Sequence, residues 1–175
     1  MKLKRQFYLR TTVGVAKDLI GKFLVHRINP STPLGTSKIY EAEIIETEAY
    51  AGFEDKASHA SRGKTARNKV MFGKPGFAYV YLIYGMYHCL NIVTEREGFP
   101  AAVLIRGLDY PKSQGPGKLC REFKITKVQN GLDMTKDVLW VEDRGLKREV
   151  AAGKRIGVDY AGVCRDWLWN FRRKD

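Results

Sequence analysis

The spacing of apolar positions predicts a helix near the N-terminus, followed by strands. Four apolar residues recur at helical spacing after Thr11, and Gly21 suits the end of the helix: Val15, Ala16, Leu19 and Ile20. Residues 22–27 and 39–47 are apolar runs of strand length, and Glu48 lies at the end of the second run. Residues 29–37 are polar, contain proline and glycine, and are typical of a loop.

The second half of the chain predicts a hairpin, a third strand and a second helix. Residues 77–84 are rich in aromatic and β-branched side chains, Gly85 interrupts them, and residues 86–94 resume the run. Residues 101–108 indicate a third strand, and residues 115–123 a short helix. Shorter strands are expected at residues 138–141, 155–158 and 167–171. Ala161-Gly162 is expected to form a turn before the last of them.

These elements predict an α+β fold with a curved, mainly antiparallel β-sheet and flanking helices. A chain of 175 residues, 44% of them hydrophobic, suits a single domain spanning residues 1–175. No apolar run approaches the roughly 20 residues of a membrane span, and the basic N-terminus lacks an apolar signal core. We therefore expect an intracellular protein, cytoplasmic or nucleoid-associated in a prokaryote and nuclear in a eukaryote.

The charge balance points to a polyanionic partner. The formal net charge is +12, and cations that neutralise phosphates release counterions, which favours binding to nucleic acid. The alternatives are a charge that serves solubility or attracts an anionic membrane. Cys89, Cys120 and Cys164 are far apart and form no CxxC pair, so we expect free thiols rather than disulfides or a zinc site.

The stretch from Glu46 to Asn91 concentrates side chains that perform chemistry on bases. It combines the carboxylates of Glu46 and Glu48 with several tyrosines, an isolated His59 and the cations Arg62, Lys64, Arg67 and Lys69. Carboxylates activate water, aromatic rings stack on bases and cations bind phosphate. Each feature also has a plainer interpretation. Glu46 and Glu48 could be surface charges on an edge strand, His59 a hydrogen-bonded structural histidine, and the cations part of a solvated loop.

Other positions add to this set. Tyr84, beside Gly85 at the hairpin tip, offers an exposed ring to a partner. Arg106 in an apolar strand is costly unless paired, and Glu48 is the candidate partner. Gly115-Pro116-Gly117 offers free backbone amides to a phosphate, with Lys118 adding charge, or is simply a helix start.

Several motifs together resemble the 3-methyladenine DNA glycosylases of the alkyladenine type. They occur in the family's order from Phe7 to about Phe171: ETEAY, the histidine after it, MFGKPG, YVYLIYGMYHCLN, AVLIR, GPGKLC and RIGVDYAG. Any one motif is weak evidence, but seven in order make a chance match improbable. The family's curved antiparallel sheet agrees with the fold predicted above.

The resemblance implies a role for each matching residue. Glu48 is the general base, and Arg106 and the backbone carbonyl of Ile156 hold the attacking water. Around the base, Tyr50 stacks on one face and His59 and Tyr81 on the other, Asn91 lies on the pocket floor and Leu104 in its wall. Tyr84 is the wedge that fills the gap in the base stack, with Met86 as the alternative. The residues expected at phosphates are Arg62, Lys64, Arg67 and Lys118.

By the same resemblance the expected activity is base excision. The protein would remove alkylated or deaminated purines, such as 3-methyladenine, 7-methylguanine, hypoxanthine or ethenoadenine, from double-stranded DNA and leave an abasic site. We expect a monomer that uses no cofactor and no metal. Two departures concern DNA contacts and fold closure: only residues 107–114 connect Arg106 to Gly115, where relatives usually carry an insertion, and the chain ends soon after Phe171.

Two other functions compete with this one. A lesion-binding module would keep the pocket without chemistry, and the joint presence of Glu48, Arg106 and Asn91 argues against it. A hydrolase of free nucleosides would need neither Tyr84 nor the excess positive charge.

Overall fold

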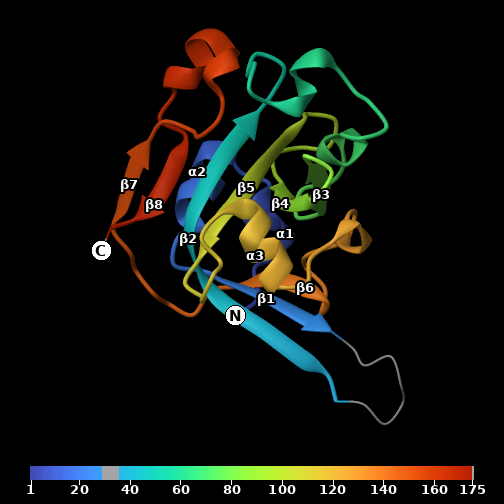
Figure 1. The fold of residues 1–175 in the computed structure, drawn as a ribbon, viewed down its shortest axis with the longest axis vertical. Coiled ribbons are helices and arrows are strands. Elements are labelled where there is room, and N and C mark those ends of the chain that lie inside the picture. The colour runs from blue at the N-terminus through green and yellow to red at the C-terminus, as the bar shows by residue number, and fades with distance from the viewer. Residues whose placement is uncertain (29–35, 175) are drawn as a thin grey trace.

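The sheet is built around one long strand, β2 (Lys38–Ala51). The computed structural model describes residues 1–28 and 36–174. The first half of β2 pairs with β1 (Phe23–Ile28), and its second half pairs with β5 (Ala101–Leu108) and β8 (Asn170–Arg173). The register between β2 and β5 shifts on both sides of Glu46, as at a β-bulge, and such shifts bend a strand. β2 therefore belongs to both parts of a curved sheet (Figure 1).

The other strands extend this sheet on both sides. Its order is β3–β4–β5–β2–β1–β6, and β7 and β8 attach through the pairing of β8 with β2. Every pairing recorded among the described residues is antiparallel. The bounds are β3 (Ala78–Ile83), β4 (Tyr87–Val93), β6 (Leu139–Glu142) and β7 (Val150–Gly153). The predicted α+β fold with a curved antiparallel sheet is confirmed.

Short helices cover the sheet. In Figure 1, α3 (Pro116–Glu122) lies in front of β4 and β5, whereas α2 (Thr12–Asp18) lies behind β2. A one-turn helix, α1 (Arg5–Tyr8), precedes α2. Four 3₁₀ helices lie in the described connections: η1 (His59–Arg62), η2 (Lys69–Phe72), η3 (Lys127–Gln129) and η4 (Asp159–Asp166).

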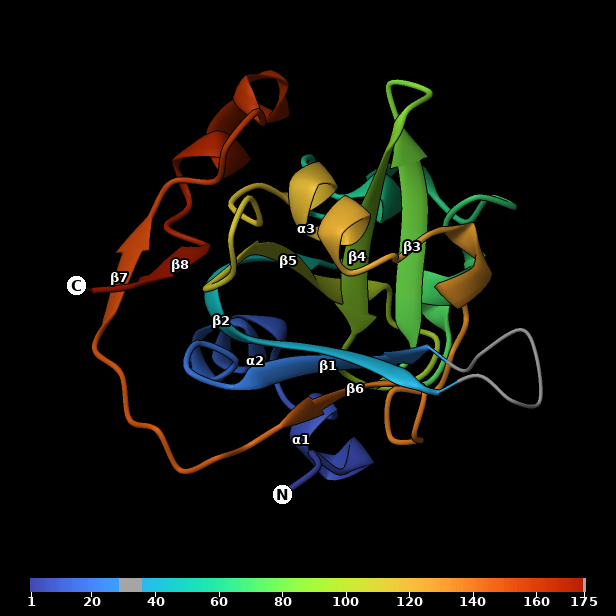
Figure 2. The same ribbon diagram turned by 60° about the horizontal axis from the view of Figure 1, so that its bottom comes forward.

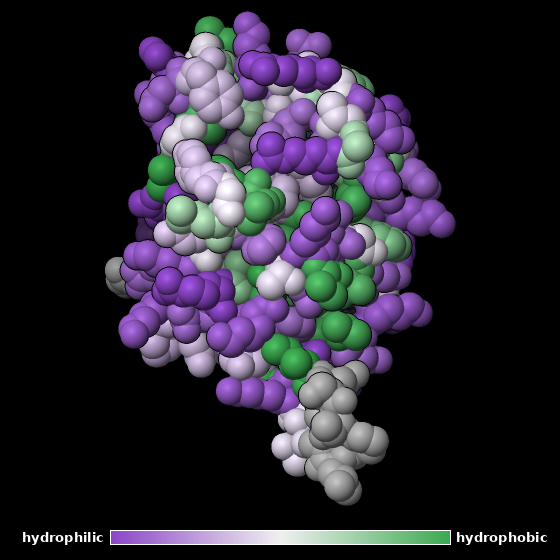
Figure 3. Space-filling view, turned by 45° about the vertical axis from the view of Figure 1, so that its right-hand side comes forward, coloured by the Kyte–Doolittle hydropathy of each residue, from purple (hydrophilic) through white to green (hydrophobic). Residues whose placement is uncertain are grey.

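The main core lies between the helices and the sheet. Leu19 of the α2 segment, Ile44 of β2, Ile105 of β5 and Phe123 at the end of α3 are fully buried in one apolar cluster. Smaller clusters lie under η2 and under η4. Hydrophilic side chains cover most of the surface seen in Figure 3, with small hydrophobic groups among them.

Most predicted elements are present, with boundaries shifted by a few residues. The helix after Thr11, the strand at residues 101–108, the hairpin with Tyr84-Gly85 at its tip and the helix at residues 115–123 are confirmed. The closing strand begins at Asn170. Gly162, at φ 58°, interrupts η4 where a turn was expected. Of the loop predicted at residues 29–37, residues 29–35 lie outside the described part of the chain.

Two predictions are wrong. Residues 155–158 form no strand, because the Ile156 N–H donates to the Glu48 carboxylate instead of a neighbouring strand and Gly157 has φ 72°. Glu48 does not lie at the end of a strand, since β2 continues to Ala51. The sequence analysis missed β7 and α1. None of the helices in the described residues is both long and apolar enough to cross a membrane.

Candidate active site

A cavity of about 150 Å³ opens where β2, β3, β4, β5 and the segment before η4 meet. Its lining includes seven residues that the resemblance implied for the base and the water: Tyr50, His59, Tyr81, Asn91, Leu104, Arg106 and Ile156. They come from four strands and two connections spread over more than 100 positions of the chain. The fold therefore gathers the predicted pocket in one place.

Glu48 lies directly behind this cavity, with no exposed side-chain surface. Its Oε1 accepts hydrogen bonds from the backbone N–H of Ile156 (2.8 Å) and from Nδ2 of Asn170 (3.0 Å). Its Oε2 accepts one from the Tyr50 hydroxyl at 2.7 Å. The interpretation of Glu48 as a surface charge on an edge strand is therefore wrong, because β2 is paired on both sides here and the carboxylate is buried.

Arg106 pairs with two carboxylates rather than with Glu48 alone. Its Nε lies 3.2 Å from Oε1 of Glu46 and 3.5 Å from Oε1 of Glu48. Glu46, Glu48 and Tyr50 follow at every second position of β2, so their side chains share one face of the strand. The positive charge of Arg106 thus compensates the negative charges of Glu46 and Glu48, which alternation along β2 brings together away from solvent.

Aromatic rings form one wall of the cavity. The His59 ring lies 4.5 Å from the Tyr81 ring at 75°, and its Nδ1 is 3.1 Å from the Tyr79 hydroxyl. Burial, and then the charge of Arg67, lower the pKa of His59, so the imidazole is neutral at pH 7. Burial raises the pKa of Tyr79 to about 12 and raises the pKa of Tyr81 as well. This wall is therefore uncharged at pH 7.

Tyr50 of β2 also lines the cavity. Burial and the neighbouring Glu48 carboxylate raise the pKa of its hydroxyl, so the phenol remains a donor to Glu48.

Asn91 is buried on β4, where its side chain both lines the cavity and bonds to the sheet. Its Nδ2 donates to the backbone carbonyls of Tyr79 (3.1 Å) and Cys89 (3.3 Å). These two bonds fix the plane of the amide. No described residue donates a hydrogen bond to Oδ1, which leaves that oxygen available to a ligand.

The hairpin tip carries Tyr84 and Met86 outward. The Tyr84 side chain is 83% exposed and that of Met86 67%. Tyr84 and Gly85 both have positive φ, 53° and 68°, and Met86 N–H donates to Ile83 C=O, as in a type I′ turn. This turn favours asparagine and glycine, so a tyrosine here is held in a sparsely populated conformation. Figure 2 shows the hairpin projecting at the top of the molecule.

The comparisons with known proteins identify the family. The sequence model of the family described as Methylpurine-DNA glycosylase (MPG) matches residues 6–175. The chain belongs to this family. Its members are DNA glycosylases, which hydrolyse N-glycosyl bonds.

Individual relatives match over nearly their whole lengths. A protein of Sodalis glossinidius is 50% identical over 176 residues, covering 97% of this chain and 95% of its own. One of Methanocella arvoryzae is 48% identical over 192 residues (99% and 92%), and one of Alkaliphilus oremlandii 45% over 202 residues (100% and 96%). Each is named "Putative 3-methyladenine DNA glycosylase". The latter two alignments exceed the 175 residues of this chain, so those relatives carry residues that it lacks.

None of the four cations predicted at phosphates forms an ion pair with a described residue, and two of them, Arg67 and Lys118, lie at the hairpin. Arg67 donates to the Leu82 carbonyl (2.9 Å), and its Cζ lies 5.4 Å from the centre of the Tyr81 ring. Lys64 lies over the Phe72 ring, and Arg62 ends η1. Lys118 of α3 borders a groove that Tyr84 and Tyr87 also line.

Three residues that support the site were not predicted from the sequence. Asp55 and Arg155 form an ion pair in which neither side chain is exposed, and Asn170 binds both Glu46 and Glu48. The sequence does not indicate that Asp55 and Arg155 pair, because the two residues are 100 positions apart. Asn170 had a usable signal, since a polar residue between Trp169 and Phe171 interrupts an apolar strand.

Proposed function

We propose that the protein is a monofunctional glycosylase of base excision repair. It flips alkylated or deaminated purines out of duplex DNA and hydrolyses their N-glycosidic bond, leaving an abasic site. The observation that carries this proposal is the Glu48 carboxylate, held by three donors directly behind a cavity with aromatic walls. No lysine lines that cavity among the described residues, which supports hydrolysis by water rather than by a Schiff base.

The hydrogen bonds of Glu48 suggest where the water binds. Oε1 has two donors, whereas Oε2 has one, Tyr50, and therefore keeps a free lone pair. A water on Oε2 can pass its proton to the carboxylate as it attacks the anomeric carbon. The remaining negative charge also stabilises the oxocarbenium character that develops on the sugar. Arg106, which lines the cavity, would help to orient this water.

The walls suit an electron-poor purine. Stacked between Tyr50 and the pair of His59 and Tyr81, a positively charged alkylated base gains cation–π attraction. Because His59 is neutral at pH 7, it adds no repulsion for such a base. Alkylated bases also leave more readily and pair poorly, so flipping them costs less.

Tyr84 is the proposed wedge that occupies the space left by the flipped nucleotide. A rigid, exposed ring at a strained turn suits insertion between base pairs, and one wedge per lesion makes a monomer the simplest assembly. Met86, the next exposed side chain, is the alternative.

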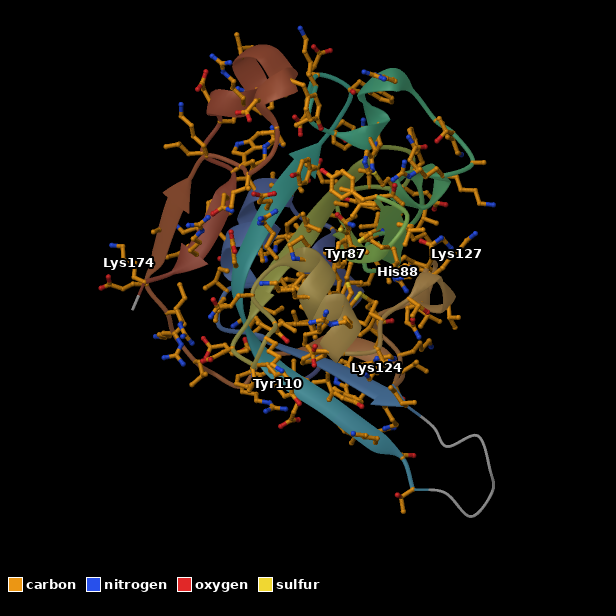
Figure 4. The ribbon with its side chains drawn as sticks, in the orientation of Figure 1. Tyr87, His88, Tyr110, Lys124, Lys127 and Lys174 are labelled. Atoms are coloured by element: carbon orange, nitrogen blue, oxygen red, sulfur yellow. The ribbon has the colours of Figure 1, made fainter. Side chains whose placement is uncertain are left out.

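Replacing Tyr84 by alanine should weaken flipping. Unstacking a base costs on the order of a few kcal/mol, and the alanine variant loses the ring that offsets this cost. We expect a smaller rise in the fluorescence of 2-aminopurine placed beside the lesion when the variant binds. Tyr110→Ala is the matched control, because Tyr110 packs on Phe123 at the end of α3, away from the hairpin (Figure 4). Tyr87 is unsuitable as a control, because it lies near the hairpin and packs on Gly117 at the start of α3. An unchanged signal for Tyr84→Ala would assign the wedge to Met86.

Two cations without an acidic partner among the described residues lie beside the hairpin, which supports a DNA-facing surface there. Arg67 donates to the Leu82 carbonyl of β3, and Lys118 of α3 borders the groove that Tyr84 and Tyr87 line. Most acidic side chains of the described chain, by contrast, are paired with arginine or lysine elsewhere.

Binding should therefore fall steeply with salt. Raising salt from about 50 to about 200 mM should lower affinity for lesion duplex at least about tenfold, as a few phosphate contacts require. Lys118→Ala should reduce the slope of log affinity against log salt by about 0.9, the contribution of one phosphate contact. Lys174→Ala, whose partner is Glu149 near the C-terminus, should leave the slope unchanged. A flat response of the wild type would favour the hydrolase of free nucleosides.

One assay separates the proposed function from its alternatives. A duplex carrying a single hypoxanthine or ethenoadenine is incubated with the protein, then treated with alkali. We expect strand cleavage at the lesion only after alkali, because a monofunctional enzyme leaves an intact abasic site. Lesion binding without cleavage would indicate a binding module, and activity only on free nucleosides would indicate the hydrolase.

A further inference from the structure

Arg155 and Asp55 form the most deeply buried ion pair described in the molecule. Nη1 and Nη2 of Arg155 donate to the two carboxylate oxygens of Asp55 at 2.6 and 2.8 Å, and neither side chain is exposed. The same nitrogens also donate to the carbonyls of Ala49 (2.9 Å) and Cys164 (3.1 Å). A guanidinium with four such bonds has one orientation, fixed by its planar fork.

This guanidinium lies against the rear of Tyr50. Its Cζ is 4.8 Å from the centre of the Tyr50 ring, and the rings of Trp169 and Trp167 lie 5.2 and 5.8 Å away. Arg155 is fully buried whereas Tyr50 lines the cavity, so the guanidinium lies behind the ring as seen from the cavity. A flipped base and Arg155 would therefore occupy opposite faces of Tyr50.

The pair is also tied to both oxygens of Glu48. Ala49, whose carbonyl Arg155 binds, is the chain neighbour of both Glu48 and Tyr50. Ile156, the next residue after Arg155, donates its N–H to Oε1 of Glu48, and the Tyr50 hydroxyl donates to Oε2. Movement of Arg155 would thus shift two of the three donors that hold the carboxylate.

We propose that Asp55 and Arg155 are positioning residues that align Tyr50 and Glu48, and that the Asp55 carboxylate keeps the rear of Tyr50 electrically neutral so that the ring accepts a cationic base. This inference rests on the proposed function. A ring attracts a cation through the negative potential of its face. The positive charge of an uncompensated guanidinium on the far face would offset this negative potential and would repel a cationic base on the other face of the ring. Asp55 cancels that charge at hydrogen-bonding distance.

The positioning role is tested with Arg155→Lys. Lysine keeps the charge but lacks the planar fork, so it cannot hold Asp55, Ala49 and Cys164 in place while stacking on Tyr50. We expect the single-turnover rate of hypoxanthine excision to fall about tenfold or more, since small displacements of catalytic groups are costly. The Kd for lesion duplex should stay within about threefold. Arg148→Lys is the control, because Arg148 makes the same kind of fork to Glu43 (2.8 Å for both bonds) away from the cavity; its rate should not change.

The charge role is tested with Asp55→Asn. This variant leaves the guanidinium uncompensated, so excision of cationic 7-methylguanine should fall about threefold or more beyond the fall for neutral hypoxanthine. Removing both charges with Asp55→Asn combined with Arg155→Met should restore the wild-type ratio of the two rates, even where both rates are low. A purely structural pair would slow both bases equally in every variant.

Melting curves accompany each variant, and rates are measured well below the melting temperature. An Arg155→Lys rate equal to that of the wild type would overturn the positioning role. If Asp55→Asn does not fold, the Arg155→Lys rate alone decides whether the pair positions Tyr50 and Glu48. A ratio of the two bases that is unchanged in folded Asp55→Asn would overturn the charge role. Wild-type protein that excises neither base would refute the proposed function instead, so the two failures are distinguishable.

Discussion

Glu48→Gln is expected to abolish base release while leaving lesion binding within about tenfold of the wild type. Glutamine keeps the shape of the side chain. Its carbonyl oxygen can still accept from Ile156 and Asn170, and the Tyr50 hydroxyl can rotate to accept from its amide. The variant loses the proton acceptor and the negative charge opposite the oxocarbenium. Loss of a general base costs about 100-fold or more, so the single-turnover rate should fall at least that far.

Glu46→Gln is the matched control for this experiment. Glu46 lies two positions earlier on the same face of β2, and it accepts hydrogen bonds from Arg106, Asn170 and Arg172. Glu48 bonds to the lining residues Tyr50 and Ile156, whereas no such bond to either is recorded for Glu46. We expect a much smaller loss of rate than for Glu48→Gln. Turnover of Glu48→Gln above about 10% of the wild type would reject Glu48 as the general base, and equal losses would assign the effect to Arg106 and Asn170, the neighbours that both acids share.

Local pattern was sufficient for the elements that carry the pocket. The aromatic and β-branched residues of β3 and the interruption at Gly85 predicted the hairpin, and the apolar run at residues 101–108 predicted β5 without error. Tyr79 and Tyr81 lie two positions apart on β3, so alternation puts them on one face, and both line the cavity. Alternation along a strand is a local rule, so it fixes which side chains share a face before any partner strand is known.

Contacts between distant segments set the limit of that reasoning. Residues 155–158 have the composition of a strand, yet Arg155 is held by Asp55 and the Ile156 N–H by Glu48, both across about 100 positions. Side-chain acceptors thereby replace the strand partner that the local pattern implied. Glu46 illustrates the same limit: its alternative as a surface charge was reasonable until β8 and Arg106 were found to cover it.

Asn91→Ser is expected to release normal guanine from undamaged DNA, which the wild type should not do, while excision of hypoxanthine persists. Guanine differs from hypoxanthine by one exocyclic amine, and a pocket rejects an added group by a clash or by leaving buried polar groups unpaired. By the resemblance Asn91 lies on the pocket floor, where its amide is well suited to reject the added amine. Two bonds to the backbone of β3 and β4 hold it at the cavity, so it cannot swing aside for a larger base. Serine is shorter and leaves room for the amine.

A plainer interpretation of Asn91 is that it only bonds to backbone within the sheet. The two bonds to the carbonyls of Tyr79 and Cys89 mean that Asn91→Ser should also lower the melting temperature, by the loss of about 1 kcal/mol per hydrogen bond. Asn130→Ser is the control, because Asn130 accepts from the Val80 N–H of β3 at 2.9 Å without lining the cavity. It should destabilise the protein without releasing guanine. Excision rates for guanine and hypoxanthine, with a melting curve for each variant, decide whether Asn91 rejects guanine. An equal loss of excision rate on both bases, together with a lowered melting temperature, would mean that Asn91 has only a structural role.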